Sequence, residues 1–307
     1  MRVQIFAQKL TGAANVLFAF IATAEPSECE RTVFKVPAQK DVDKEAEEKS
    51  APSAQVVYEA IRKEGRHELE RTSSSLAWSG LAAGMSMGFS FVTMAVLEHC
   101  LPDAPWKPLI TSFGYSVGFL IVILGRQQLF TENTLTVILP LLTQKTLRDV
   151  YKVLILWSVV LTTNLVGTFL FAWAVAKTDG FNPDLRGAFD QVAAQSMTHP
   201  FGVMIWQGVF AGWLIALMVW LLPAAETARI WIIVVITWMV AVFHFPHIIA
   251  GASETFYLAI TAQRSFGEIL NGFILPALIG NTIGGVTLVA ALAHAQTIGD
   301  KKQHGHE

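Results

Sequence analysis

Long apolar runs separated by short polar links dominate the chain from about residue 76 onward. The runs are Leu76–Leu97, Leu109–Leu142, Val150–Ala176, Phe201–Leu222, Ile230–Ile260 and Ile269–Ala293. Each is long enough for a helix that crosses a bilayer, which takes about 20 apolar residues. The pattern therefore predicts an all-α membrane protein with six transmembrane segments.

Two of these runs are interrupted by polar residues, glycine or proline. The second contains GRQQLFTEN at Gly125–Asn133, and the fifth contains FPHIIAG at Phe245–Gly251. Backbone that leaves a helix at bilayer depth must be buried in protein or line a cavity, and an ionisable group at that depth indicates a functional site. Both breaks are therefore predicted to lie at a solute pathway, with His247 in the second.

The two halves of the apolar region resemble each other. The first and fourth segments carry Gly-x-x-x-Gly, the second and fifth are the broken ones, and the third and sixth contain Asn-x-x-Gly at Asn164 and Asn281. Three segments per half, an odd number, make the second copy enter the membrane from the opposite side. Broken segments at matching positions of inverted repeats mark a midplane binding or conduction site. The predicted fold is therefore two inverted three-helix repeats.

Polar sequence flanks this transmembrane domain, which is expected over residues 76–295. Residues 1–53 are interpreted as an extension or linker, whose short apolar run over residues 12–21 is either a targeting segment or part of an interfacial or disordered extension. Residues 54–75 predict an amphipathic surface helix against the membrane or a neighbouring subunit, with a solvated helix held by charge pairs as the alternative. Residues 296–307 predict a polar tail.

Basic residues set the expected orientation. Lys145, Arg148 and Lys152 follow the second segment, and Lys301 and Lys302 lie in the tail. The positive-inside rule then places both termini in the cytoplasm.

Composition narrows the function classes. Of 307 residues, 53% are hydrophobic and 15% charged, which is far from soluble averages. The formal net charge of −2, without a phosphate-binding glycine loop, argues against nucleic acid. Pro246 disrupts a helical pair of His244 and His247, so we expect no metal and no cofactor. No nucleophile and base have a recognisable spacing, which argues against an enzyme.

Thr131 and His247 are the strongest candidates for contact with a solute. Histidine titrates near neutral pH, so His247 can donate a hydrogen bond or a proton to an anion. Thr131 either donates its hydroxyl or only caps the helix that follows. Leu129 and Phe130 are interpreted as an apolar constriction that excludes hydrated ions.

Other polar residues near the breaks support this site. Asn164 and Asn281 are buried amides that need partners, and they bond the broken backbone, orient His247, or do both. Glu132 and Glu254, one in each half, are expected at the start of the helices after the breaks, where the helix dipole stabilises negative charge.

Four motifs together resemble the formate/nitrite transporter family of pentameric membrane channels. They are LFT at 129–131, NLVG at 164–167, FPHIIAG at 245–251 and GNTIGG at 280–285. The resemblance covers about Leu76–Ala293. It implies an aquaporin-like fold that conducts small monovalent anions such as formate and nitrite, an inner-membrane location and a homopentamer.

The resemblance also implies residue roles. It makes His247 the central pore histidine and Thr131 the loop threonine, with Asn164 and Asn281 as supporting amides. It places at the constriction positions Tyr115, Phe119 and Val240.

The chain departs from the family pattern where charge is concerned. Where the family has acidic residues before LFT and before the histidine, this chain has Gln128 and Pro246. Where the family has vestibule lysines, the alignment gives positions near Glu68 and Ser196. Arg126 is the candidate to replace part of that positive field, with a structural ion pair as the alternative. Because a glutamate in place of a lysine reverses its effect on an anion, the chain is interpreted as a divergent branch.

We therefore predict a membrane channel for small weak-acid anions, in which His247 supplies a hydrogen bond or a proton. The alternative is a neutral small-solute channel of the aquaporin-like type, which the missing lysines favour and the absence of an Asn-Pro-Ala motif disfavours. A membrane enzyme or sensor that uses the His/Glu cluster is a third, less favoured hypothesis.

Overall fold

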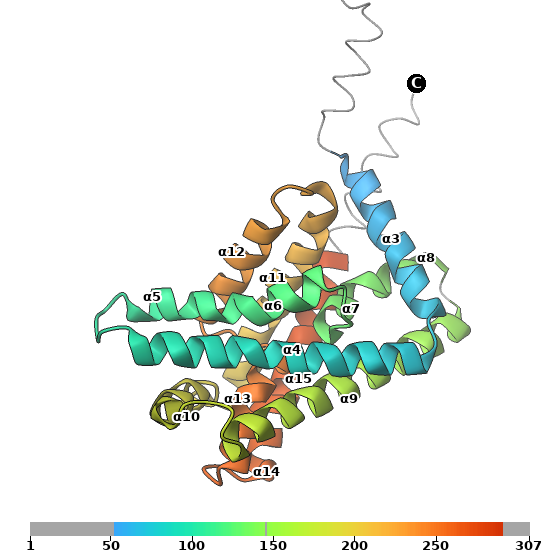
Figure 1. Ribbon diagram of the computed structural model, residues 1–307. Coiled ribbons are helices and arrows are strands. Elements are labelled where there is room, and N and C mark those ends of the chain that lie inside the picture. Colours follow the sequence, from blue (N-terminus) through green and yellow to red (C-terminus); the bar gives the residue numbers. More distant parts are fainter. Residues whose placement is uncertain (1–51, 145, 291–307) are drawn as a thin grey trace, which may run out of the picture. The chain divides into compact units, whose positions relative to one another are not determined.

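The computed structural model describes residues 52–144 and 146–290. Residues 1–51, 145 and 291–307 lie outside this range, and with them lie nearly all of the predicted linker, Lys145 and the predicted tail with Lys301 and Lys302. The chain divides between Ala51 and Pro52 into two units, and the second is described below. Every regular element in its described part is helical (Figure 1).

Five helical stretches are long and apolar enough to cross a membrane. Three consist mainly of one helix: α4 (Ser73–Cys100), α9 (Leu147–Lys177), and α11 (Phe201–Leu221) with η4 (Leu222–Ala224). The fourth stretch joins α5 (Lys107–Thr111), η2 (Ser112–Tyr115) and α6 (Ser116–Leu124), and the fifth joins α14 (Phe266–Ile269), η5 (Leu270–Ile274), α15 (Leu275–Ile283) and η6 (Gly284–Val289).

The remaining apolar helices are shorter. The fifth predicted segment consists of α12 (Arg229–Val242) and α13 (Ile248–Ile260), neither of which alone is long enough to span a bilayer. In the second predicted segment, α6 is followed after five residues by α7 (Phe130–Thr136) and α8 (Ile138–Gln144). The helical hydrogen bonds stop at the polar and proline-containing stretches.

Glycines allow two helix pairs to approach to backbone contact. α4 packs along α9, and α11 along α15. A Cβ at Gly84 would lie 2.1 Å from the carbonyl oxygen of Asn164, and one at Gly212 would lie 2.3 Å from that of Asn281. No side chain fits at these distances, so glycine at both positions lets the asparagine-bearing helices α9 and α15 pack directly against α4 and α11.

Two further helices pack on this bundle. α3 (Ala54–Glu70) contacts α7, α8 and α11, with Val57, Ile61 and Gly65 buried. Beyond η3 (Pro183–Leu185), α10 (Arg186–Gln195) packs on α4 and α13 through Phe189 and Val192. α10 lies in the link between the third and fourth apolar runs.

Candidate solute site at the two helix breaks

The two breaks have the same backbone geometry. Arg126 and His244 adopt left-handed conformations, with φ of 49° and 53°, which is uncommon for residues with a side chain. Each lies four residues before the first residue of the next helix. The intervening chain ends in an extended N-cap residue, Leu129 (φ −106°, ψ 128°) or His247 (φ −108°, ψ 120°).

Asn164 on α9 satisfies the backbone of the first break. Its Oδ1 accepts a hydrogen bond from the amide of Phe130 at 2.9 Å. Its Nδ2 donates to the carbonyl of Gln128 at 2.9 Å and to that of Gly80 on α4 at 2.7 Å. One buried amide therefore holds both sides of Leu129 and ties the break to α4.

Asn281 on α15 makes the equivalent contacts in the other half. Its Oδ1 accepts from the amide of Ile248 at 2.8 Å, and its Nδ2 donates to the carbonyls of Pro246 at 2.8 Å and Gly208 at 2.9 Å. Of the roles left open for the two asparagines, the hydrogen bonds show the one in which they bond the broken backbone.

The two breaks meet at Thr131 and His247. Thr131 Oγ1 lies 2.8 Å from His247 Nε2, and each side chain is 1% exposed. His247 Nδ1 accepts a hydrogen bond from the amide of Ala250 at 3.2 Å. Because a backbone amide can only donate, Nδ1 is unprotonated, so in neutral His247 the Nε2–H donates to Thr131. The Thr131 hydroxyl hydrogen is then free for a solute.

The alternative in which Thr131 only caps the following helix is wrong. Thr131 is the second residue of α7, whose N-cap is Leu129, and no side chain caps that helix. The capping side chain is His247, which is the N-cap of α13.

Apolar and aromatic residues surround the pair. The ring of Phe119 meets the ring of His247 edge-on at 5.0 Å between centroids, and Tyr115 lies 5.3 Å from Phe119. Val240 is fully buried and lines a cavity together with His247. The structure thus brings the three predicted constriction residues to His247.

The other two predicted constriction residues lie at the first break. Leu129 and Phe130 are both buried. The ring of Phe130 packs edge-on against Trp157 of α9 at 5.9 Å.

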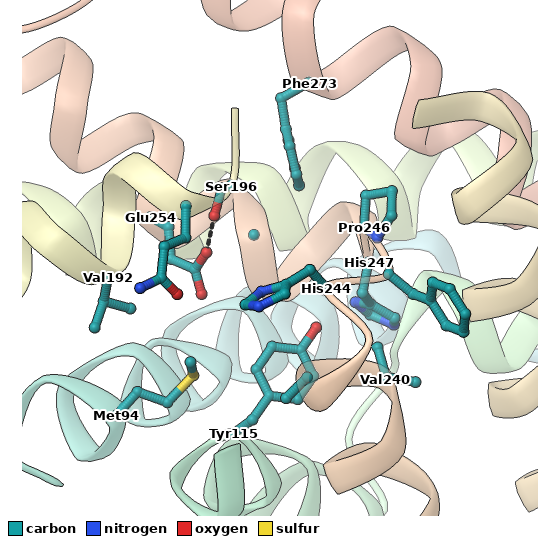
Figure 2. A pocket seen from close by; sticks show the side chains of 14 residues that line it. Met94, Tyr115, Val192, Ser196, Val240, His244, Pro246, His247, Glu254 and Phe273 are labelled. Atoms are coloured by element: carbon teal, nitrogen blue, oxygen red, sulfur yellow. Dashed lines mark hydrogen bonds between the residues drawn. The ribbon is translucent and has the colours of Figure 1, made fainter. Parts of the chain in front are cut away.

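A cavity of about 50 Å³ opens beside His247. We call it the α10 vestibule, because Val192 and Gln195 of α10 form part of its wall. Its other lining residues include Tyr115, His244 and Glu254 (Figure 2).

A second cavity of about 240 Å³ adjoins the α10 vestibule, with Met94 and His244 lining both. It also contains Glu98, Asp103 and Lys107. The Lys107 ammonium lies 2.8 Å from Glu98 and 3.1 Å from Asp103, so its charge is more than compensated by these carboxylates.

Glu254 lies deeper than the sequence predicted. It was expected at the start of the helix, but it is the seventh residue of α13. Its carboxylate accepts a hydrogen bond from the hydroxyl of Ser196 at the end of α10. The available signal was its spacing, since residues 247, 251 and 254 share one helix face and all line the α10 vestibule.

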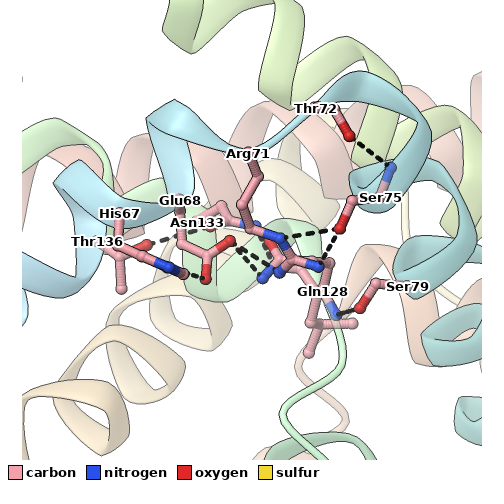
Figure 3. A network of polar contacts seen from close by, with 10 residues as sticks. His67, Glu68, Arg71, Thr72, Ser75, Ser79, Gln128, Asn133 and Thr136 are labelled. Carbon is pink, nitrogen blue, oxygen red and sulfur yellow. Dashed lines mark hydrogen bonds and ion pairs between the residues drawn. The ribbon is translucent and has the colours of Figure 1, made fainter.

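Near α3, two residues that depart from the family pattern form a hydrogen bond with each other. Gln128 Nε2 donates to Glu68 Oε2 at 2.8 Å, and Arg71 donates to the same oxygen at 3.0 Å (Figure 3). Gln128 Oε1 accepts from Asn133 at 2.9 Å. Glutamine in place of the expected acid and glutamate in place of the expected lysine therefore form one contact.

Two further features considered from the sequence are a positive charge at Arg126 and a metal site formed by histidine and glutamate. Arg126 is exposed at its turn and lines neither of the two cavities. His244, His247 and Glu254 line one cavity, but within residues 52–144 and 146–290 no three His, Cys, Asp or Glu residues are placed to hold a metal ion.

Apolar helices of spanning length around a buried polar pair define a multi-pass membrane transport protein. The formate/nitrite transporter family matches residues 55–295, and the chain belongs to this family.

Known relatives include transporters and channels. The chain is 39% identical to "Inner membrane protein YfdC" of Escherichia coli over 257 residues, which is 83% of each protein. It is 24% identical to "Nitrite transporter NirC" of Salmonella typhimurium over 69% of this chain and 79% of that protein. A solved "Pentameric formate channel with formate bound" has the same fold, with a TM-score of 0.62 and 20% identity over 73% of this chain and 97% of that one.

Proposed function

We propose that the protein is an inner-membrane channel for small monovalent weak-acid anions of the formate and nitrite kind, with Thr131 and His247 in contact with the solute. The observation that carries this proposal is the buried 2.8 Å contact between the two side chains, which joins the breaks of both halves. Membership in the formate/nitrite transporter family supports the solute class.

The proposed topology has six spanning segments in two inverted repeats. α4, α5 to α8 and α9 form the first repeat, and α11, α12 to α13 and α14 to η6 form the second. The matching turns at Arg126 and His244 and the matching contacts of Asn164 and Asn281 support this arrangement. Both termini lie in the cytoplasm, with α3 as a surface helix on that side.

The site acts on the solute through neutral hydrogen-bond donors. A bare anion in an apolar pore is costly, and Phe119, Leu129 and Val240 offer it no polar atoms from their side chains. The hydroxyl of Thr131, oriented by the Nε2–H of His247, offers a donor between the two breaks. A carboxylate or nitrite oxygen can accept it in place of lost water.

The assembly in the membrane is proposed to be a homopentamer, the state named for the solved formate channel. Large aromatic side chains on the spanning helices, Trp78, Trp206 and Trp231, are 70–72% exposed in the single chain. Such residues suit lipid or a neighbouring subunit rather than water.

Flux measurements in proteoliposomes test the proposal. We expect His247→Ala and Thr131→Val to reduce formate and nitrite flux roughly tenfold or more, the effect of losing a hydrogen bond of about 1.5 kcal/mol to a charged group. Thr131→Ser keeps the hydroxyl and should retain most of the flux. Wild-type flux in either His247→Ala or Thr131→Val would contradict the assigned roles.

A channel for neutral small solutes is the second candidate. The carboxyl group of Glu254 in the α10 vestibule favours it, because a carboxylate repels an anion. Liposome swelling in glycerol or urea separates the two: swelling without formate or nitrite flux would select the neutral-solute channel.

A further inference from the structure

Glu254 and His247 face the same cavity from one helix. With Gly251 between them, they lie seven residues apart on one face of α13, which corresponds to about 10 Å along the helix axis. Glu254 is 7% exposed. A solute in the α10 vestibule therefore has both Glu254 and His247 in its wall.

His247 is poorly placed to give a proton to that solute. Its Nδ1 already accepts from the amide of Ala250, so a proton there would place two donors against each other and remove the cap of α13. Its Nε2–H is directed at Thr131. The geometry stabilises neutral His247, and a proton for an anion must come from another group.

The walls of the α10 vestibule offer hydroxyl groups in place of cations. No lysine or arginine lines this cavity in the described part of the chain. Ser196, where the family resemblance implies a lysine, donates its hydroxyl to Glu254.

Tyr115 provides a second hydroxyl. It is 5% exposed, and its hydroxyl points into the cavity (Figure 2) without a hydrogen bond to another residue of the described ranges. A ligand with oxygen atoms would satisfy this group.

We propose that Glu254 is a proton donor of the α10 vestibule, which converts an entering weak-acid anion into its neutral acid. The O–H bond of the Glu254 carboxyl breaks, and a new O–H bond forms on the solute oxygen. The neutral acid then moves past His247, and the Glu254 carboxylate recovers a proton from water in the adjoining cavity. This inference rests on the proposed function and assigns the proton to a residue other than the pore histidine.

Several other titratable groups lie near Glu254. Tyr115 on η2, His244 on the turn before α13 and His247 line the same cavity. On α10, Asp190 accepts hydrogen bonds from Tyr257 and Gln263. In the adjoining cavity Glu98 is paired with Lys107. Within the described ranges, Glu254 is the carboxyl group that lines the vestibule itself.

The test follows formate and protons together in proteoliposomes. With formate on the vestibule side, wild-type protein should move about one proton per formate, and flux should rise as the pH on that side falls. Glu254→Gln keeps the size and an acceptor for Ser196 but has no transferable proton. We expect it to lower flux roughly tenfold or more and to remove the dependence on pH.

Matched variants separate this inference from the proposed function. Asp179→Asn makes the same carboxyl-to-amide change at an exposed loop position and should leave flux and pH profile unchanged. If His247→Ala is slow while Glu254→Gln keeps wild-type flux and pH profile, only the proton-donor role is overturned. If Glu254→Gln does not assemble, the wild-type stoichiometry decides, because formate flux without proton movement overturns the inference.

Discussion

At the scale of single residues, the chemistry of the site depends on which groups are already satisfied. His247 is at once a helix cap and a partner of Thr131. A histidine at a membrane break suggests a proton carrier from sequence alone. The backbone amide of Ala250 changes that interpretation, because it fixes the tautomer and makes His247 a hydrogen-bonding group.

The two asparagines allow a direct stability test. Asn281→Ala leaves the amide of Ile248 and the carbonyls of Pro246 and Gly208 without their buried partner, and each such loss costs about 1–3 kcal/mol. We expect a clearly lower thermal unfolding midpoint in detergent. Asn271→Ala is the control, since Asn271 is exposed and, within the described ranges, its side chain bonds only the carbonyl of Gly267 one turn earlier. Equal midpoints for the two variants would contradict the view that the hydrogen bonds of Asn281 stabilise the second break.

At the scale of elements, the breaks were predictable because their cause is local. Polar residues and proline stop helical hydrogen bonding wherever they cluster, and glycine at Gly84 and Gly212 signals close helix packing. What the sequence did not reveal are contacts between distant elements. Ser196 and Glu254, or Gln128 and Glu68, meet only after α10 and α3 have docked.

The contact between α3 and the first break can be tested by changing the charges at Glu68 and Gln128 singly and together. Glu68→Lys places an ammonium against the Nε2 of Gln128 and against Arg71, and should destabilise the protein by about 1–3 kcal/mol. Adding Gln128→Glu restores an acceptor for the lysine, so we expect recovery with a coupling energy of about 1–2 kcal/mol.

Thermal unfolding of both single variants and the double variant measures this coupling. Glu70→Lys introduces the same charge change at the exposed last residue of α3 and should change stability little. Strictly additive effects of Glu68→Lys and Gln128→Glu would show that the two residues do not act as one contact.

At the scale of the whole molecule, the same construction occurs twice in one chain. Each half supplies a left-handed turn, an extended N-cap residue and an asparagine that bonds the backbone on both sides of it. The halves differ at the centre, where one N-cap residue is Leu129 and the other is His247. This difference produces a polar pair at the meeting point of two loops with matching backbone geometry.

Every residue of the proposed pathway belongs to one chain, and this predicts how mixed assemblies behave. When wild-type and His247→Ala subunits are co-assembled in varied ratios, formate flux should increase linearly with the wild-type fraction. Stopped-flow measurements on proteoliposomes of known subunit composition provide the readout. A steep loss of flux at low variant fractions would mean that subunits share a pathway or act cooperatively.

The cap formed by His247 has an evolutionary consequence. Serine, threonine, asparagine and aspartate are all favoured at the first position of a helix, so any of them can replace His247 and still start α13. Their shorter side chains do not reach Thr131 as an imidazole does. On the proposed role of His247, we expect such a substitution to abolish transport while the fold persists, which is a one-step mutational path from a channel to an inactive scaffold.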